Sequence, residues 1–168
     1  MHGVPLRLAV CVLACALGVL AGASVAAAAK HRHHATQAGA RRVQLLRLER
    51  RRRDRIVVLA WRAVGAPYRW GGSSPRGGFD CSGLTQWVYR HIGISLPHYT
   101  ASQWRYGRRV PRRAIRAGDL LFFSGLGHVG IYLGHGALIH APHPGARVQL
   151  AHLRGWLASS FYGARRLA

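Results

Sequence analysis

The sequence is short of acidic residues, of lysine and of cysteine. Only 4 Asp and Glu residues stand against 25 Lys and Arg residues, and the formal net charge is +21 at pH 7. So positive a surface attracts polyanions such as nucleic acid, anionic lipid or an acidic cell wall. Because Lys30 is the only lysine, a general preference for arginine in the genome is an alternative source of this charge.

The beginning of the chain has the layout of a secretory signal peptide. An apolar run starts at Leu8, and small residues of the Ala-x-Ala kind precede Lys30. This pattern predicts a signal peptide over residues 1–29, removed by cleavage between Ala26 and Lys30. The run is also long enough to stay in the membrane as an anchor, which is the alternative. We therefore expect an exported protein of the periplasm, cell wall or extracellular space, and no nucleic acid as partner.

Cysteine is scarcer still in the mature chain, which lacks the predicted signal peptide. Cys11 and Cys15 lie within residues 1–29, so the mature chain holds Cys81 alone. A single cysteine excludes an internal disulfide, which leaves a reactive thiol or a disulfide to another chain. The reactive thiol is the sharper interpretation.

The mature chain divides at about residue 55. Residues 30–55 carry ten basic and two acidic residues, and we expect a partly disordered or helical basic arm. From Ile56 the pattern becomes that of a folded domain, residues 56–168. Its first helix is predicted by apolar positions spaced three and four residues apart, and it ends at Gly65 and Pro67. These positions are Ile56, Leu59, Ala60, Ala63 and Val64.

A second helix is predicted to start at Cys81, with Asp80 as its N-cap, and to end at Gly93. Short apolar runs separated by Gly, Pro and His follow, and they indicate antiparallel strands. The predicted strands are residues 120–123, 129–133, 137–141 and 148–151, with a tight hairpin at residues 134–136. Helices first and strands second predict an α+β fold.

The position of Cys81 at a helix start predicts a nucleophile. Unpaired N–H groups and the helix dipole favour the thiolate, and they lower the pKa of cysteine at such positions. Hydrolysis also needs a proton carrier, and His128 and His140 lie on strands that are predicted to be neighbours. His128 would act as base and His140 would orient it. Two alternatives are a histidine that is merely satisfied in the core, and a zinc site formed by Cys81, His128 and His140.

Four ordered blocks carry a resemblance to a known family. They are YRWGGSSPRGGFDCSGL, RAGDLLFF, GHVGIYLG and ALIHAP, and the match runs from about residue 56 to residue 166. They resemble the NlpC-type cell-wall endopeptidases, which have a papain-like fold with the nucleophile at a helix N-terminus. The resemblance implies Cys81 as nucleophile, His128 as base and His140 as third polar residue, with no metal or other cofactor.

The resemblance also implies supporting residues. Tyr68 corresponds to a tyrosine near the oxyanion and substrate, and Asp80 and Ser82 correspond to positions that hold the substrate peptide. The segment LPHYTASQ departs from the family pattern, since His98 and Tyr99 stand where relatives often have a basic residue and a small hydroxyl residue.

The expected function is hydrolysis of amide bonds in peptidoglycan stem peptides through a thioester. The family typically cuts between D-γ-glutamyl and diaminopimelyl residues. We expect a monomer whose residues 41–55 contact anionic wall polymers or a membrane surface. A non-catalytic basic module that binds wall or membrane, and an acyltransferase that uses the same Cys and His residues, are the alternatives.

Overall fold

The computed structural model describes residue 37 and residues 39–168, which fall into two units, residues 1–47 and 48–168. The described residues of the first unit are helical and exposed. The predicted signal peptide, residues 1–29, and the first residues of the basic arm lie outside the described residues. Among those that are described, no helix is both long and apolar enough to cross a membrane.

One continuous helix covers residues 39–63, so the part of the basic arm from residue 39 and the first helix of the predicted domain form a single element. In the second unit its inner face is formed by Ile56, Leu59 and Ala60, which are 0–5% exposed, as predicted from their spacing. Val64 was predicted on the same face but is 38% exposed. The helix has already ended there, and the chain turns through Gly65, whose φ of +87° suits glycine.

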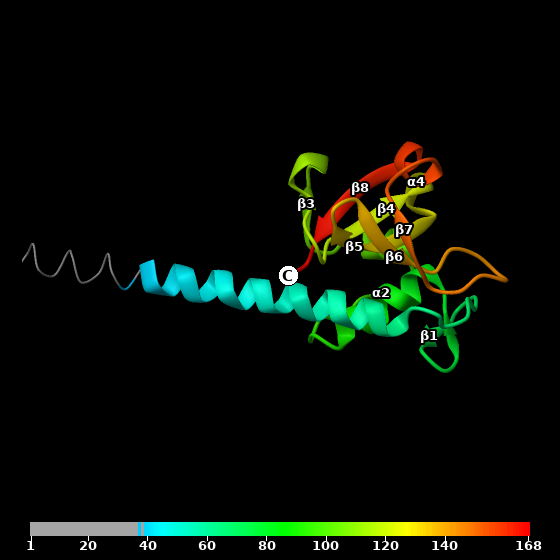
Figure 1. Ribbon diagram of the computed structural model, residues 1–168, viewed down its shortest axis with the longest axis horizontal. Helices are drawn as coiled ribbons and strands as arrows, with labels where there is room; N and C mark the ends of the chain where they lie inside the picture. The colour runs from blue at the N-terminus through cyan, green and yellow to red at the C-terminus, as the bar shows by residue number, and fades with distance from the viewer. Residues whose placement is uncertain (1–36, 38) are drawn as a thin grey trace, which may run out of the picture. The chain divides into compact units, whose positions relative to one another are not determined.

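A six-stranded antiparallel sheet forms the centre of the second unit, with strand order β3-β8-β4-β5-β6-β7 (Figure 1). Its strands are β3 (Arg108–Val110), β4 (Leu120–Phe123), β5 (His128–Gly134), β6 (Ala137–His140), β7 (Gln149–His152) and β8 (Phe161–Arg166). A separate hairpin consists of β1 (Ser73–Ser74) and β2 (Gly78–Phe79). The helical elements are α2 (Cys81–Arg90), α3 (Thr100–Gln103), α4 (Trp156–Ser159), η1 (Arg112–Ala114) and η2 (Ser124–Leu126).

The four strands predicted from apolar runs are confirmed as β4 to β7, and the α+β fold is confirmed with them. The tight hairpin is also confirmed: Gly134, His135 and Gly136 all have positive φ between β5 and β6. The sequence did not predict β3 and β8. Both are rich in arginine, and β8 pairs with β3 on one side and β4 on the other, which places the last strand inside the sheet.

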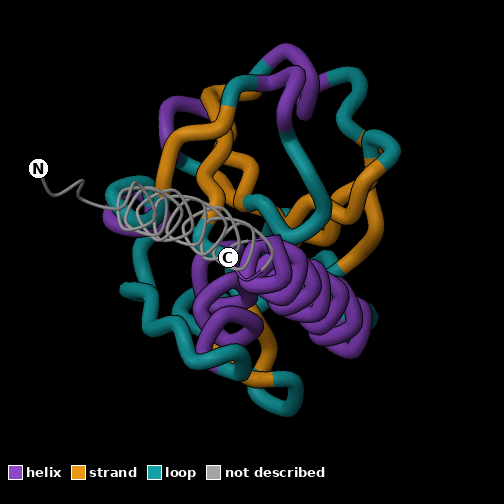
Figure 2. The backbone as a smooth tube through the Cα atoms, turned by 90° about the vertical axis from the view of Figure 1, so that its left-hand side faces the viewer, coloured by secondary structure: helices purple, strands orange, loops and turns teal. Residues whose placement is uncertain are grey.

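The two faces of the sheet bury separate apolar clusters. One face packs against α2 and the helix that ends at residue 63, through side chains such as Leu84, Val88 and Ile131. On the other face, Leu121, Phe123 and Leu138 pack with Leu157 of α4 (Trp156–Ser159). Figure 2 shows these two helices beside the strands of the sheet. Burial of both faces stabilises α2 against the sheet, and α2 carries Cys81 at its first position.

A buried ion pair joins β8 to the turn before β4. Arg166 donates from Nε and Nη2 to the two carboxylate oxygens of Asp119, both at 2.7 Å. Asp119 is 1% exposed and Arg166 is 9% exposed. Tyr89 of α2 donates its hydroxyl to the carbonyl of Gly118 in the same turn. These bonds tie α2, β4 and β8 together at one end of the sheet.

Replacement of Asp119 by asparagine should strongly destabilise the protein. The change keeps the shape but leaves the Arg166 guanidinium buried without its counter-charge, and loss of one member of a buried pair costs about 3–5 kcal/mol. Asp54→Asn removes an exposed carboxylate and is the matched control, with an expected change within about 0.5 kcal/mol. Urea unfolding followed by circular dichroism measures both variants. Equal stability of the two variants would contradict this view of the pair.

Candidate active site

The Asp80 carboxylate caps the start of α2, as the sequence predicted. Its Oδ1 accepts hydrogen bonds from the Gly83 N–H at 2.7 Å and from the Ser82 hydroxyl at 2.9 Å. Its Oδ2 accepts one from the Gly71 N–H at 2.8 Å. Burial disfavours the charged carboxylate, but these bonds and the bond to His98 outweigh it, so that the pKa of Asp80 is lowered. The cap is therefore ionised at neutral pH.

Residues 71–79 come very close to the first turn of α2. The Asp80 N–H donates to the Gly72 carbonyl at 3.0 Å. A Cβ on Gly83 would lie 2.0 Å from that same carbonyl oxygen, so only glycine fits at this position. This requirement explains the glycine after Cys81 and Ser82, and it fixes the wall of the site beside the thiol.

Cys81 is the first residue of α2 and is partly exposed. Its Sγ lies 3.7 Å from the hydroxyl oxygen of Thr100, and the N–H groups of Val129 and Ser82 lie close enough to favour its charged form. Val129 follows His128 in β5, so the thiol lies next to the strand that carries the predicted base. At the first helical position, the Cys81 N–H has no carbonyl of a preceding turn to bond.

The predicted lowering of the pKa of Cys81 is corrected by the structure. Desolvation by burial is the largest effect on this thiol and raises its pKa, and the nearby Asp80 charge acts in the same direction. Hydrogen bonds from Thr100, Val129 and Ser82 offset this only in part. The helix dipole and the free N–H groups favour the thiolate, but desolvation outweighs them, so the resting residue is a neutral thiol.

His128 and His140 form the predicted pair. His128 Nε2 lies 2.9 Å from His140 Nδ1, and both side chains are buried. A side chain at Gly130 would collide with the neighbouring strand, since a Cβ there would lie 3.2 Å from the His140 Cβ and 2.7 Å from Leu138. Because Nε2 of His128 is occupied, Nδ1 is the ring nitrogen left to take a proton. For Nδ1 of His128 to accept a proton, its Nε2 must carry the ring hydrogen and donate it to Nδ1 of His140. His140 then carries its own ring hydrogen on Nε2.

Burial also keeps both histidines neutral. Desolvation lowers the pKa of His128 to about 4, with a further contribution from His140. Desolvation lowers the pKa of His140 to about 4 as well, and nearby His143 adds to it. At neutral pH the site thus combines a neutral thiol with a neutral imidazole that is oriented by a second imidazole.

Two hollows flank these groups. One, of about 380 Å³, is lined by Cys81 together with Tyr68, Asp80, Ser82, His98 and Thr100. It brings together every predicted supporting residue. Burial raises the pKa of Tyr68, and the proximity of Cys81 and Asp80 raises it further, so its hydroxyl stays protonated and able to donate. The other hollow, of about 540 Å³, is lined by His128, His140, Arg154, Trp156 and Leu157.

Three residues of the polar link after Pro97 belong to the site, although the sequence did not indicate their roles. His98 Nε2 lies 2.9 Å from both Asp80 oxygens, and Thr100 borders the thiol. Gln103 is fully buried and donates to the carbonyls of Ser82 and Pro97. A glutamine in an otherwise polar segment carries no periodic signal, and only its burial identifies it.

The zinc alternative finds no support in the geometry. Within residue 37 and residues 39–168, no three His, Cys, Asp or Glu side chains are placed to hold a metal ion. Nε2 of His128 is directed at another imidazole rather than at a shared centre.

The neutral histidine pair predicts a loss of stability in mild acid. Each pKa is about 4 in the folded protein against 6.5 in the unfolded chain, so the unfolded state binds more protons between these values. The free energy of unfolding should be highest above pH 6.5 and should fall by a few kcal/mol as the pH drops to 4. Urea titrations across this range measure it.

The matched variants are His140→Asn and His152→Gln. His140→Asn should flatten the pH dependence, because one buried imidazole is removed. His152 is exposed on β7, and its replacement should leave the dependence unchanged. If the natural protein and both variants showed the same dependence of the free energy of unfolding on pH, the histidine pair would not be the cause of that dependence.

Comparison with known proteins agrees with this geometry. The model of the NlpC/P60 family matches residues 65–166. Peptidoglycan endopeptidase RipA of Mycobacterium tuberculosis is 41% identical over 105 residues, which cover 54% of this chain and 22% of RipA. A probable endopeptidase of Corynebacterium glutamicum is 47% identical over 87 residues, or 51% of this chain and 41% of the relative. The chain thus spans less than half of these relatives.

Solved structures show the same fold. The NlpC/p60 domain of peptidoglycan hydrolase SagA is 37% identical with a TM-score of 0.63, over 68% of this chain and 98% of that domain. Peptidoglycan hydrolase RipB of Mycobacterium tuberculosis is 28% identical with a TM-score of 0.64, over 70% of this chain and 65% of RipB. With the family model covering most of the second unit, the chain belongs to the NlpC/P60 family.

Proposed function

We propose that the protein is a cysteine peptidase that hydrolyses amide bonds in peptidoglycan. The observation that carries this proposal is the position of the Cys81 thiol beside β5, with the His128–His140 pair on the same sheet. The names of the relatives RipA, SagA and RipB support peptidoglycan as the substrate. The hollow beside Cys81 is open to a peptide substrate.

The neutral pair implies general-base catalysis. His128 Nδ1 takes the thiol proton while Sγ attacks the carbonyl carbon, and an S–C bond forms. The Cys81 N–H donates to the oxygen that becomes negative. The C–N bond then breaks as the imidazolium gives its proton to the leaving amine, and a thioester remains. Water, activated by the same imidazole, attacks the thioester, releases the acid and restores the thiol.

The two hollows divide the substrate between them. The leaving amine must approach His128, so its residue enters the hollow that contains Arg154 and Trp156. The acyl part lies on the Tyr68 side, where the ionised Asp80 favours an amino group or N–H donors of the stem peptide. The exposed Arg154 suits a carboxylate on the amine side. Cleavage between D-γ-glutamyl and diaminopimelyl residues fits this division, since diaminopimelate carries carboxylates.

The direct test is mass spectrometry of purified peptidoglycan after digestion. The natural protein should release stem-peptide fragments cut at one bond, whereas Cys81→Ala should release none, because no other group at the site can form the thioester. Cys11→Ala removes a cysteine of the predicted signal peptide and should have no effect on the digestion. Fragments released equally by Cys81→Ala would disprove the peptidase.

The same digestion separates the two alternatives. A binding module that lacks catalysis leaves the wall intact while it sediments with it. An acyltransferase transfers the acyl group to an added amine such as glycine amide, and the product shows the added mass. Hydrolysis without that adduct in the presence of the amine identifies water as the acceptor.

We further propose that the protein is exported by its first 29 residues and that the arginines of the basic arm contact anionic wall polymers. Deletion of the whole arm is unsuitable as a test, because Arg53 packs against Gly118. Replacement of the exposed Arg41, Arg42 and Arg47 by glutamine should lower retention on isolated walls at low salt. The control replaces Arg76, Arg90 and Arg105, also exposed, in the same way. Equal retention of both variants would show that the arm does not contribute to wall binding.

A further inference from the structure

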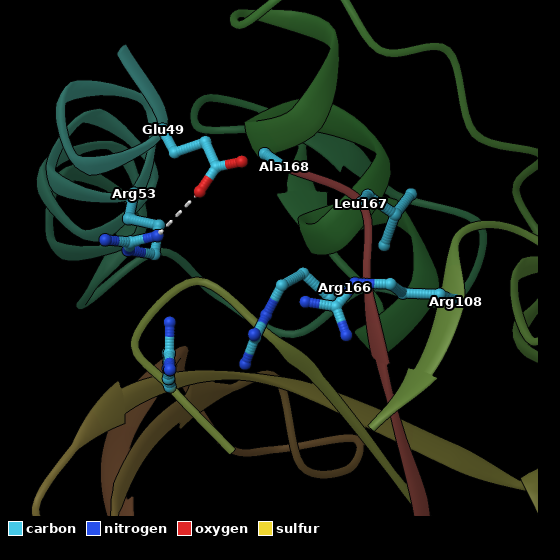
Figure 3. A pocket seen from close by; sticks show the side chains of 7 residues that line it. Glu49, Arg53, Arg108, Arg166, Leu167 and Ala168 are labelled. Carbon is cyan, nitrogen blue, oxygen red and sulfur yellow. Dashed lines mark ion pairs between the residues drawn. The ribbon is translucent and has the colours of Figure 1, made fainter. Parts of the chain in front are cut away.

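Four arginines from separate parts of the second unit surround a hollow away from the active site. Arg53 comes from the N-terminal helix, Arg108 from β3, Arg116 from the turn before β4 and Arg166 from β8. The hollow has a volume of about 290 Å³, and Glu49, Leu167 and Ala168 complete its lining. Figure 3 shows Arg53, Arg108 and Arg166 around it, with the ion pair between Arg53 and Glu49.

Two of these arginines are held in place by the fold. Arg166 donates from Nε and Nη2 to the Asp119 carboxylate, and from Nη2 also to the Ala114 carbonyl. In the described part of the chain its Nη1 has no hydrogen-bond partner. Arg53 packs its Cα and Cγ against Gly118, at 3.6 and 3.5 Å from the position of a Cβ there. The base of the hollow is therefore preorganised, and the donor on Arg166 Nη1 is directed by a rigid pair.

The other two arginines have no acidic partner. Arg108 and Arg116 are exposed, and neither forms an ion pair within residues 39–168. Even when Glu49, Asp119 and a carboxylate at Ala168 are all counted, the four guanidinium groups leave the hollow with a net charge of +1. A cluster of like charges around a hollow is stabilised by an anion that enters it.

The arrangement suits a phosphate group better than a carboxylate. One or two guanidinium groups in a single plane satisfy the two oxygens of a carboxylate, whereas a tetrahedral phosphate accepts hydrogen bonds from several directions. Here the guanidinium groups approach from four different elements. Arginine also binds phosphate in a bidentate manner that lysine does not reproduce.

The hollow is separate from the catalytic centre. Phe123 pairs with His128 at one end of β4, and Leu120 pairs with Arg165, the neighbour of Arg166, at the other end. Three residues of extended strand separate the two ends by about 10 Å. The same ligand group cannot occupy both sites, and none of the four arginines belongs to the proposed chemistry.

From these observations we infer that the arginine pocket, formed by Arg53, Arg108, Arg116 and Arg166, binds a phosphodiester group of a linear anionic polymer. Residues 56–168 hold 14 arginines against two aspartates, so a polymer with repeated phosphates is attracted over the whole surface while one phosphate occupies the pocket. The lining has only Leu167 and Ala168 as apolar residues, which argues for a soluble polymer rather than insertion into a bilayer.

Calorimetric titration of the Cys81→Ala protein with a glycerol-phosphate oligomer tests this inference without any hydrolysis. Its outcome is independent of the proposed peptidase function. The variant Arg108→Gln/Arg116→Gln removes the two arginines that lack partners and spares the Asp119–Arg166 pair. It should weaken binding about tenfold or more, since each lost bond to a charged group is substantial. The control Arg76→Gln/Arg90→Gln removes two other exposed arginines and should weaken binding less than about twofold.

Each other result would overturn the inference. Equal weakening in both double variants would mean that binding follows net charge alone. Equal affinity for a polyglutamate of the same length would show that the pocket does not select phosphate. Tighter binding to phosphatidylglycerol vesicles than to the oligomer, with the same dependence on Arg108 and Arg116, would assign the pocket to a membrane instead. Binding of inorganic phosphate that the oligomer does not displace would exclude a polymer.

Discussion

The Asp80 carboxylate holds together the start of α2, residues 71–79 and the segment after Pro97. It accepts hydrogen bonds from Gly71, Ser82 and Gly83, and it pairs with His98. Without these bonds the first turn of α2 would have unpaired N–H groups, and Cys81 would be held less firmly relative to the hollow beside it. One buried charge thus defines both the position of the nucleophile and a wall of the substrate site.

Desolvation determines the chemistry that this arrangement supports. The same burial that packs α2 onto the sheet raises the pKa of Cys81 and lowers the pKa values of His128 and His140. Each group is kept in its neutral form, so reaction depends on proton transfer at the moment of attack. Because Nε2 of His128 is engaged with Nδ1 of His140, Nδ1 of His128 is the ring nitrogen left for proton transfer.

Charge is concentrated at the opposite end of the sheet from the catalytic groups. The Asp119–Arg166 pair stabilises that end, and Arg166 also lines the arginine pocket. A structural ion pair and the proposed phosphate site therefore share the same residue. The catalytic end contains the neutral thiol and imidazoles, the ionised Asp80 and the exposed Arg154, so the two ends offer different groups to a ligand.

The sequence by itself determined the elements with a regular pattern or a local rule. Alternation along β5 placed His128 on the face opposite Val129 and Ile131, and the position before α2 identified Asp80 as the cap. The tertiary structure alone decided the roles of His98 and Gln103, which lie in a segment without periodicity, and the membership of β3 and β8 in the sheet. It also reversed the expected pKa shift of Cys81. The reason is physical: capping and alternation act between residues close in the chain, whereas burial depends on segments that are distant in sequence and meet only when the chain folds.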